Sequence, residues 1–414
     1  MSHAPALPAF AGYGIELEYM IVDRQTLSVL PIADRLLHAA AGETASDVDR
    51  GRFGWSNEIV LHLVELKNGR PDPALEPLGA GFQAEVDAIN RLLHPMGAQL
   101  MPTAMHPWMD PAAEAHLWPH RNAPIYQAYD RIFGCHTHGQ ANLQSMHLNL
   151  PFANDEEFAR LHAAVRLLLP ILPALAASSP IADGTPSGVL DTRMEGYRTA
   201  VSRVPSVIGQ VIPDTVSNCA DYQARVLAPM YRDIAPLDPD GVLQHEWLNA
   251  RGAIPRFDRN ALEIRVIDVQ ECPQADLAIA AVATAVIRAL YDGQWSPLAA
   301  QQALGTDALA NILSACIRDA EAATIDDAGY LRLLGFPGHS CQAGALWRHL
   351  VEATLPDHGG PWHAPLRVIL EQGPLARRIL RAVGPACSKD RLHSVYLELC
   401  DCLRGNTLAP AGKA

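Results

Sequence analysis

The chain has 414 residues, of which 49% are hydrophobic and 19% are charged, and its formal net charge at pH 7 is -13. This composition is typical of a globular protein with a large core and excludes an intrinsically disordered chain. The negative charge argues against nucleic acid as a partner and suits a protein that handles metal-neutralised anions.

The first predicted element is a strand over residues 14–23, Gly-Ile-Glu-Leu-Glu-Tyr-Met-Ile-Val-Asp. Because side chains alternate between the two faces of a strand, Glu16 and Glu18 share one face and the apolar residues share the other. Two carboxylates this close repel each other unless one is protonated or a cation lies between them. A solvated strand face is the plain alternative, but similar polar faces recur along the chain.

A second strand is predicted over residues 57–67, Asn-Glu-Ile-Val-Leu-His-Leu-Val-Glu-Leu-Lys. Glu58 and Glu65 are seven residues apart, so a regular strand would put them on opposite faces. Either one of them is structural, or a bulge or bend brings both to the same face. Residues 73–93 follow as a predicted helix, because their apolar residues recur at spacings of three and four.

The segment 106–129 is rich in Pro, His, Trp and Tyr and has no clear period. We interpret it as an ordered loop over a site, with a packed surface loop as an equal alternative. His136 and His138 have metal-ligand spacing on a predicted strand. They give a weak signal, because no third ligand lies near them in the sequence.

A third strand with a polar face is predicted over residues 145–152, where His147 and Asn149 share one face. Asn154 then caps a helix with an acidic first turn, which Pro170 and Pro173 kink or end. Further on, residues 184–203 contain three arginines, including Arg198 and Arg203. These arginines either carry surface charge or supply planar donors for carboxylate or phosphate groups.

The fourth strand is predicted over residues 261–268, and Glu263 and Arg265 share its polar face. A strongly apolar helix starts at Asp276 and stops at Gly293. All of the chain beyond that point is predicted to be helical, with apolar stripes typical of packed helices.

The remaining sequence features indicate the cellular compartment in which the protein is expected. No stretch reaches the roughly 20 apolar residues of a membrane span, and the N-terminus lacks the basic and apolar regions of a signal peptide, so we expect no membrane partner. None of the eight cysteines forms a Cys-x-x-Cys pair, which disfavours a zinc ribbon or a redox motif. Cys400 and Cys402 fall in a predicted amphipathic helix, where we expect them to pack. The reducing cytoplasm is the expected location.

If the four strands pair in one antiparallel sheet, their polar faces form a single acidic floor and their apolar faces are buried under helices. Five or six carboxylates and a histidine on one floor need divalent cations to neutralise them. Oxygen-dominated ligands favour Mg²⁺ or Mn²⁺ over Zn²⁺, and Mg²⁺ on carboxylates commonly takes nucleotide phosphate as a further ligand. The chain has no Gly-x-x-x-x-Gly-Lys-Ser/Thr loop, which excludes a P-loop enzyme.

An ordered set of motifs resembles the glutamate–cysteine ligase type 2 family, the bacterial carboxylate–amine ligases related to glutamine synthetase. The motifs span about residues 12–290 and are Gly-Ile-Glu-Leu-Glu-Tyr, Glu58-(x)6-Glu65-Leu, Met-His-Leu-Asn-Leu-Pro-Phe, Ala-Leu-Ala-Ala-Ser-Ser-Pro at 174–180, Gly-Tyr-Arg198-Thr and Leu-Glu263-Ile-Arg265-Val-Ile-Asp. The resemblance implies an α+β fold with a largely antiparallel, glutamine-synthetase-like sheet. One face of that sheet is polar and binds metal, helices pack on the other face, and the C-terminal part is helical. We expect a single catalytic domain over residues 10–405, with the motif-bearing core at 12–292 and the helical region at 296–405.

The resemblance also implies roles for single residues. Arg265 corresponds to a catalytic arginine beside the ATP phosphates, and Arg198 to one that binds substrate or phosphate oxygens. Arg203 and Asn149 are the further candidates for ATP binding. The implied metal ligands are Glu16, Glu18, Glu58, Glu65, His147 and Glu263.

Two positions depart from the family pattern. Asn149 stands where many members have a second histidine, and Lys67 stands where a threonine is common. Both positions are implied to lie near the substrate, so they put the identity of the amine and of the acid in doubt.

The leading hypothesis is an ATP- and Mg²⁺- or Mn²⁺-dependent ligase that joins a small carboxylic acid to a small amine through an acyl phosphate. On the resemblance, the acid is glutamate and the acceptor is cysteine or another amine. One alternative is a zinc amidohydrolase built on His136, His138, His147 and a bridging carboxylate. Another is an inactive module that binds a nucleotide or a metabolite. The sequence allows a homo-oligomer.

Overall fold

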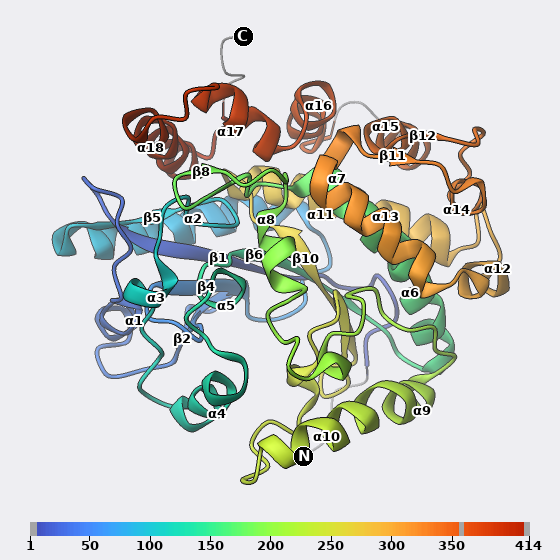
Figure 1. Cartoon of the computed structure of the whole chain (residues 1–414), viewed down its shortest axis with the longest axis horizontal. Helices are drawn as coiled ribbons and strands as arrows, with labels where there is room; N and C mark the ends of the chain where they lie inside the picture. Colours follow the sequence, from blue (N-terminus) through green and yellow to red (C-terminus); the bar gives the residue numbers. More distant parts are fainter. Residues whose placement is uncertain (1–5, 356–359, 410–414) are drawn as a thin grey trace.

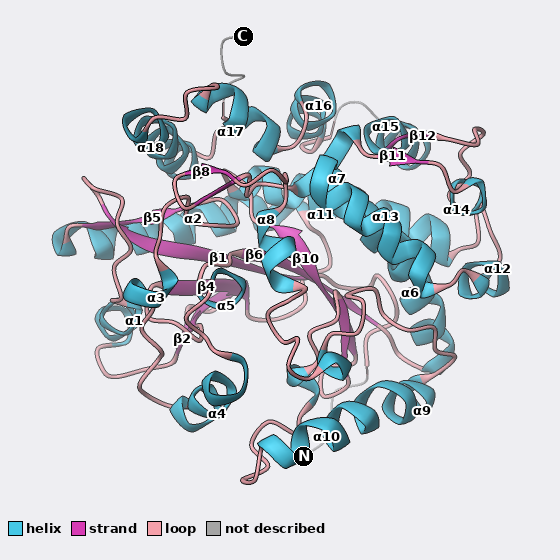
Figure 2. Ribbon diagram, viewed as in Figure 1, coloured by secondary structure: helices cyan, strands magenta, loops and turns pink. Residues whose placement is uncertain are grey.

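The computed structural model describes residues 6–355 and 360–409 of the chain. An antiparallel sheet of eight strands lies at the centre of this described part, with the strand order β2-β3-β4-β1-β6-β10-β9 and with β5 paired to β1 (Figure 2). The strands are β1 (Gly14–Asp23), β2 (Asp47–Asp49), β3 (Phe53–Asn57), β4 (Leu63–Asn68), β5 (Ala98–Met101), β6 (Ser145–Pro151), β9 (Ala253–Arg256) and β10 (Ala261–Asp268). The largely antiparallel α+β fold that the sequence predicts is confirmed.

One face of the sheet packs against helices because its side chains are apolar. Ile15, Leu17 and Tyr19 on β1 are fully buried and belong to the main hydrophobic core. The helices that contact this core and the neighbouring strands are α2 (Glu76–Leu93), α6 (Asp155–Leu168), α7 (Leu172–Ala176) and α11 (Pro273–Tyr291). The predicted Asn154 cap of α6 is present, because its side chain accepts a hydrogen bond from the backbone N–H of Glu157 at 3.0 Å.

Shorter helices and loops pack partly against the core helices and partly around the other face of the sheet (Figure 1). These helices are α1 (Ala33–Ala41), α3 (Pro111–Glu114), α4 (Ala123–Phe133), α5 (His138–Ala141), α8 (Thr192–Tyr197), α9 (Cys219–Tyr222) and α10 (Ala228–Ile234). The C-terminal part adds α12 (Leu298–Ala303), α13 (Thr306–Asp319), α14 (Ala328–Leu333), α15 (Ala343–Thr354), α16 (His363–Gln372), α17 (Leu375–Val383) and α18 (Lys389–Gly405).

The C-terminal part is not wholly helical as predicted. Two short strands, β11 (Thr324–Ile325) and β12 (Cys341–Gln342), pair with each other there, and the hairpin β7 (Ile181–Ala182) and β8 (Thr185–Pro186) lies earlier in the chain. Cys400 and Cys402 are buried in α18, which confirms that they pack.

Two helical stretches are long and apolar enough to span a membrane by length and composition alone, although the sequence analysis expected none. They are Asp155–Ala176 and Pro273–Tyr291, and 94% and 78% of their most apolar windows are buried within the protein. Both are therefore core helices. They are apolar on all sides because other parts of the protein cover them on several sides.

The predicted second strand, residues 57–67, is confirmed only for residues 63–67, and the bend allowed between Glu58 and Glu65 is present. β3 ends at Asn57 and β4 begins at Leu63, and the chain reverses between them. Residues 59–61 are apolar, as in a strand, but they lie in the connection between β3 and β4 and form backbone hydrogen bonds with residues 116–118. Leu61 N–H donates to the carbonyl oxygen of His116 at 2.8 Å, and Trp118 N–H donates to that of Ile59 at 2.9 Å.

The segment around His136 and His138 also differs from its prediction. Neither residue lies on a strand, because residues 134–137 are irregular and His138 begins α5. The predicted loop over residues 106–129 is ordered, but it contains α3 and the start of α4.

Three buried histidines make the folded state sensitive to acid. Burial lowers the pKa of His62 and of His106 to about 4, and burial together with the nearby Arg166 lowers the pKa of His162 to about 3. These side chains are neutral in the folded protein and become charged in the unfolded chain below about pH 6.5. The stability cost is therefore absent above about pH 7, grows as the pH falls, and levels off near the folded-state pKa.

The substitution His162→Leu should remove part of this cost. At pH 5 the cost from His162 is at most about 2 kcal/mol, so the loss of unfolding free energy between pH 7 and pH 5 should shrink by about that amount. Urea unfolding at the two pH values measures the difference. The control His38→Leu, at an exposed position on α1, should keep the wild-type difference, and an unchanged difference in His162→Leu would contradict the assignment.

Candidate active site

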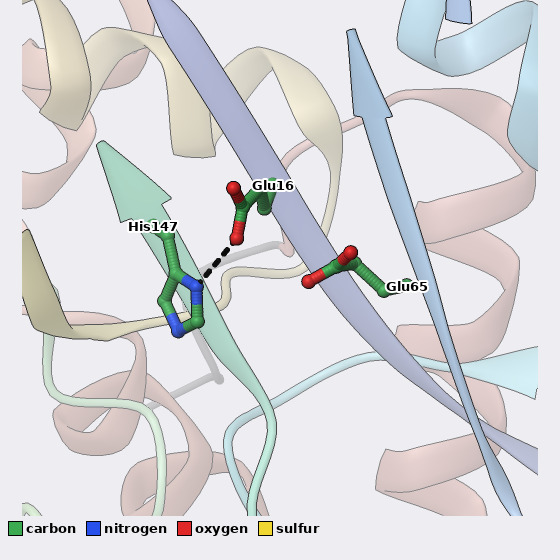
Figure 3. Close-up of side chains that lie close together, drawn as sticks. All are labelled: Glu16, Glu65 and His147. Carbon is green, nitrogen blue, oxygen red and sulfur yellow. Dashed lines mark hydrogen bonds and ion pairs between the residues drawn. The ribbon is translucent and has the colours of Figure 1, made fainter. Parts of the chain in front are cut away.

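The strand register gathers polar side chains on the face of the sheet away from the core helices. On β1, Glu16 lies opposite His147 of β6 and Lys67 of β4, and Glu18 lies opposite Glu65 of β4. Side chains directly opposite in an antiparallel pair have Cβ atoms about 5 Å apart. The predicted acidic floor is therefore formed, and Figure 3 shows Glu16, Glu65 and His147 pointing toward one another.

Glu58 joins this floor although it lies seven residues before Glu65. It follows the last residue of β3, and the chain reversal between β3 and β4 removes the parity problem of a single strand. Two groups of three side chains result within the described residues, and each group offers ligand atoms within 4.8 Å of one another. The groups are Glu16, Glu65 and His147, which we call cation group A, and Glu18, Glu58 and Glu65, which we call cation group B. They share Glu65.

His147 is held between the two glutamates of β1. Its Nδ1 lies 2.8 Å from Glu16 Oε2, and its Nε2 lies 3.0 Å from Ser145 Oγ, which in turn donates to Glu18 Oε2 at 2.9 Å. Burial alone lowers the pKa of His147, but the hydrogen bond with Glu16 and the charge of Glu18 raise it to about 9. Without a metal ion, the histidine therefore carries a proton that a bound cation would displace.

Glu65 is neutralised by a lysine. Its Oε1 accepts from Lys67 Nζ at 2.9 Å and from Ser56 Oγ at 2.7 Å. Burial raises the pKa of Glu65, but the ammonium group of Lys67 outweighs that effect and lowers the pKa to about 2.

Among the described residues, Glu16 and Glu58 lack a lysine or arginine partner, and only Glu16 is hydrogen-bonded to His147. Burial and the charge of Glu65 raise the pKa of Glu16, and burial with the charges of Glu18 and Glu65 raises the pKa of Glu58 well above its ordinary value. Carboxylates that resist ionisation because of their neighbours are relieved by a divalent cation. Five of the six predicted metal ligands belong to cation groups A and B, and this oxygen-rich set fits Mg²⁺ or Mn²⁺.

Glu263, the sixth predicted ligand, lies between two arginines. Arg256 Nη1 is 2.8 Å from Glu263 Oε2, and Arg265 Nε is 3.1 Å from Oε1. Burial raises the pKa of Glu263, but these guanidinium groups and His147 lower it below its ordinary value. Glu263 thus orients two arginines at the edge of the floor and belongs to neither cation group.

A cavity of about 220 Å³ opens over the floor. Glu18, Glu58 and His147 lie on its polar side, and Arg193 and Arg265 add positive charge. Its remaining lining is aromatic, aliphatic and neutral polar: Ile59, Leu63, Tyr126, Tyr129, Gln140, Leu143, Ser145, Tyr197, Trp247, Leu248 and Ala250. Tyr126 is tied to β3, because its hydroxyl accepts from Asn57 Nδ2 at 3.2 Å.

The predicted arginines separate in the structure. Arg265 lines the cavity, whereas Arg198 pairs with Glu195 at 2.7 Å and Arg203 donates to the backbone carbonyl oxygen of Ile132. Neither of these two is among the described residues that line the cavity. Asn149 lies on the floor and donates to Glu16 Oε1 at 3.2 Å.

Sequence reasoning missed Arg193. It is buried, its Nε donates to Asp268 Oδ1 at 2.5 Å, and its Nη2 has no hydrogen-bond partner within the described part of the chain. The sequence carried a signal, since Arg193 is the first of the three arginines in residues 184–203 that were considered as donors for carboxylate or phosphate groups. An unsatisfied donor on a cation in the cavity wall is suited to bind an anionic group.

His136 and His138 take no part in this site. Among the described residues, neither belongs to a group of three metal-ligating side chains. His138 instead contacts Asp183 and Asn142. The histidine set that a zinc amidohydrolase would need is therefore not assembled around His147.

The family assignment follows from comparison with known proteins. The model of the glutamate–cysteine ligase family 2 matches residues 13–329, which is more than half of the chain. The chain belongs to glutamate–cysteine ligase family 2. It is thereby an ATP-dependent ligase of the class that forms carbon–nitrogen bonds, and the predicted family resemblance is confirmed.

Named relatives of this family member include proteins from archaea and bacteria. It is 37% identical over 276 residues to an uncharacterized protein of Archaeoglobus fulgidus, covering 67% of this chain and 74% of that protein. It is 27% identical over 289 residues to a Salinispora tropica protein provisionally named glutamate–cysteine ligase 2, covering 67% of this chain. The matched region spans 65% of the Salinispora protein and about half, 47%, of a similarly named protein of Rubrobacter xylanophilus.

Solved structures share the fold of this glutamate–cysteine ligase family 2 member at low sequence identity. Glutamate–cysteine ligase of Francisella tularensis in complex with AMP superposes with a TM-score of 0.62 at 12% identity, covering 97% of this chain and 90% of that one. A bifunctional glutathione synthetase of Pasteurella multocida gives a TM-score of 0.58 at 14% identity, covering 96% of this chain and 53% of that one.

The crowding of Glu58 can be tested without turnover. The pKa of Glu58 is raised, so its stability cost is absent below about pH 4.5 and grows as the pH rises. In EDTA at pH 7, Glu58→Gln should therefore raise the unfolding free energy, by the roughly 0.5–2 kcal/mol that relief of an unfavourable charge commonly gives, and at pH 4 the gain should vanish. Urea unfolding gives both values.

The matched control is Glu65→Gln, which removes the partner of Lys67 and should lower stability at pH 7. A destabilised Glu58→Gln protein at pH 7 would show that Glu58 is not held against other carboxylates.

Proposed function

We propose that this protein is an ATP- and Mg²⁺- or Mn²⁺-dependent carboxylate–amine ligase that forms an amide through an acyl phosphate. The proposed acid is glutamate, reacting at its γ-carboxylate, and the acceptor is cysteine or another small amine. The observation that carries the proposal is the pair of oxygen-rich cation groups sharing Glu65, set beside Arg265 in one cavity. We propose a cytoplasmic location and small molecules as the partners.

The donor set supports divalent cations held by Glu16, Glu18, Glu58, Glu65 and His147. When bound, such ions neutralise phosphate charge and hold the oxygens of the reacting groups. Glu263 orients Arg265 instead of serving as a primary ligand, because both of its oxygens already face arginines. Asn149 keeps its proposed place near ATP on the floor, whereas the proposed roles of Arg198 and Arg203 rest on the family motif alone.

Arg265 is the residue that we propose to stabilise charge on the transferring phosphoryl group. Its guanidinium group is fixed by Glu263 and by a hydrogen bond from its Nη1 to the backbone oxygen of Asn249 at 3.2 Å. A donor held in place before the reaction needs no reorganisation as charge develops. Arg193 supplies a second guanidinium group, and its unpartnered Nη2 is suited to a carboxylate or phosphate oxygen.

The wall of the cavity supports a reaction that has to exclude water. An acyl phosphate is lost to hydrolysis if water reaches it, and closed apolar sites prevent that side reaction. Tyr126, Tyr129, Tyr197 and Trp247 line the cavity. We propose that these rings shield the activated acid until the amine arrives.

The proposal is tested by trapping the activated acid. The purified protein with ATP, Mg²⁺ and glutamate should release ADP and, with hydroxylamine as the amine, should form glutamyl hydroxamate. Mass spectrometry of reactions with a set of amines, cysteine included, then identifies the natural acceptor. Absence of any acid-dependent ADP release across a panel of small carboxylic acids would overturn the proposal.

Arg265→Lys keeps the charge but loses the planar set of donors that matches phosphate oxygens. The kcat for ADP release should fall by about 10²-fold or more, as for other residues that stabilise transition-state charge, with little change in thermal stability. The control Arg259→Lys, at an exposed arginine in the turn before β10, should keep wild-type kcat. Wild-type kcat in Arg265→Lys would return Arg265 to the role of a structural partner for Glu263.

Glu58 and Glu65 should both be needed for turnover, because the turn between β3 and β4 brings them into one cation group. Glu58→Ala and Glu65→Ala should each abolish ADP release at low Mg²⁺ concentration. Activity assays over a Mg²⁺ series check this, with Glu43→Ala, an exposed glutamate after α1, as the control. Full activity of Glu58→Ala would mean that Glu65 is a ligand without Glu58.

A further inference from the structure

Lys67 places a permanent positive charge inside the acidic floor. Its Nζ lies 2.9 Å from Glu65 Oε1, 2.8 Å from Ser56 Oγ and 3.8 Å from Asp47 Oδ1. The register of β3 and β4, in which Ser56 pairs with Glu65, fixes this arrangement. Its side chain is one-third exposed, at 32%, whereas that of Glu65 is buried, at 10%.

The contacts of Glu65 limit what else it can bind. A carboxylate oxygen has two lone pairs, and Oε1 already accepts one hydrogen bond from Ser56 Oγ and one from Lys67 Nζ. Within the described residues, no hydrogen bond is made to Oε2. One oxygen of Glu65 therefore remains for a metal ion, and a carboxylate that bridges two ions normally gives one oxygen to each.

Both cation groups need Glu65. Cation group A has Glu16 and His147 as its other members, and cation group B has Glu18 and Glu58. With Oε1 engaged by Lys67, only one of the two groups can use Glu65 at a time. The other group is left with two protein ligands, which is few for a cation that prefers six oxygens.

The charge balance points the same way. The two groups together hold four carboxylates, which two divalent cations would neutralise if Lys67 were absent. With the ammonium group present, a second divalent cation would give these four carboxylates one excess positive charge, which the solvent-exposed carboxylate of Asp47, 3.8 Å from Lys67 Nζ, screens only weakly. The phosphates of a nucleotide would cancel that excess and supply the missing ligands.

Resting on the proposed function, we propose that Lys67 is a fixed monovalent cation of the acidic floor, which restricts Glu65 to one divalent cation and makes tight binding of a second ion depend on nucleotide. Lys67 is thus a positioning residue for Glu65. Without nucleotide, the wild-type protein binds one divalent cation tightly, and neutral replacements of Lys67 bind two.

The test counts Mn²⁺ ions bound to the full chain without nucleotide, by electron paramagnetic resonance of free Mn²⁺ during titration. The proteins are wild type, Lys67→Met, Lys67→Thr and Lys67→Arg, with Lys389→Met at the exposed start of α18 as the matched control. Wild type, Lys67→Arg and Lys389→Met should bind one Mn²⁺ tightly. Lys67→Met and Lys67→Thr should bind a second Mn²⁺ with a Kd at least tenfold lower than in wild type.

Addition of the non-hydrolysable analogue AMP-PNP provides a second measurement on wild type. The second Mn²⁺ should then bind at least tenfold more tightly, whereas in Lys67→Met the gain should be smaller. Thermal melting in EDTA establishes that each variant is folded before titration, and Lys67→Thr keeps the test decisive if Lys67→Met misfolds.

Each other result overturns the inference in a distinct way. Equal stoichiometry and Kd values within twofold in wild type and both neutral variants would show that Lys67 does not restrict Glu65. Two tight Mn²⁺ ions in wild type without nucleotide would overturn the role of Lys67 and leave the proposed ligase function standing. No Mn²⁺ bound by any folded protein, with or without AMP-PNP, would overturn the proposed function as well.

Discussion

The antiparallel register of β1 between β4 and β6 forces acidic side chains onto one small face of the sheet. Glu16 and Glu18 are two residues apart on β1, and their cross-strand partners include His147 and Glu65. The opposite face of the same strand is fully buried in the core, so a shift of register by one residue would bury the carboxylates and expose the apolar residues. Core packing therefore holds the charges together against their repulsion.

Some carboxylates of the acidic floor have basic partners and others do not. This difference separates the part of the floor that needs a metal ion from the part that is suited to phosphate. Glu263 is balanced by Arg256 and Arg265, and Glu65 by Lys67. No such basic partner relieves Glu58, whose pKa is the one raised well above its ordinary value on the floor. The demand for an external cation is thus concentrated around Glu58 and its neighbours, whereas the arginine end is prepared for phosphate oxygens. One sheet face supplies both environments because β10 and β4 lie on opposite sides of β1 and β6.

Much of this arrangement could be predicted from alternation alone. The strands at residues 14–23 and 261–268 were expected with their observed bounds, since alternating polar and apolar residues fix both the element and its faces. Alternation fails where an apolar run is required by tertiary contacts. Residues 59–61 lie in the turn between β3 and β4 and pair with residues 116–118. The sequence shows that these residues are apolar but does not show their partner. The same limit explains Arg193, whose place in the cavity depends on a buried partner, Asp268, that lies 75 residues away in the chain. His136 and His138 have the spacing of metal ligands, but they do not lie on a strand. Their side chains therefore do not share a strand face, and the spacing alone does not form a site.

The turn between β3 and β4 joins the wall of the cavity to its floor. Its backbone is hydrogen-bonded to His116 and Trp118, and the residue before Glu58, Asn57, is bonded to the hydroxyl group of Tyr126. The segment 116–126, which contributes Tyr126 to the cavity wall, is therefore hydrogen-bonded directly to the turn that carries Glu58. Any displacement of that segment when a substrate enters would change the separation of Glu58 from Glu65, which is anchored separately on β4. Binding of a substrate in the cavity would then change the affinity for the metal ion, and the metal ion would change the affinity for the substrate. The coupling would pass through two short stretches of backbone.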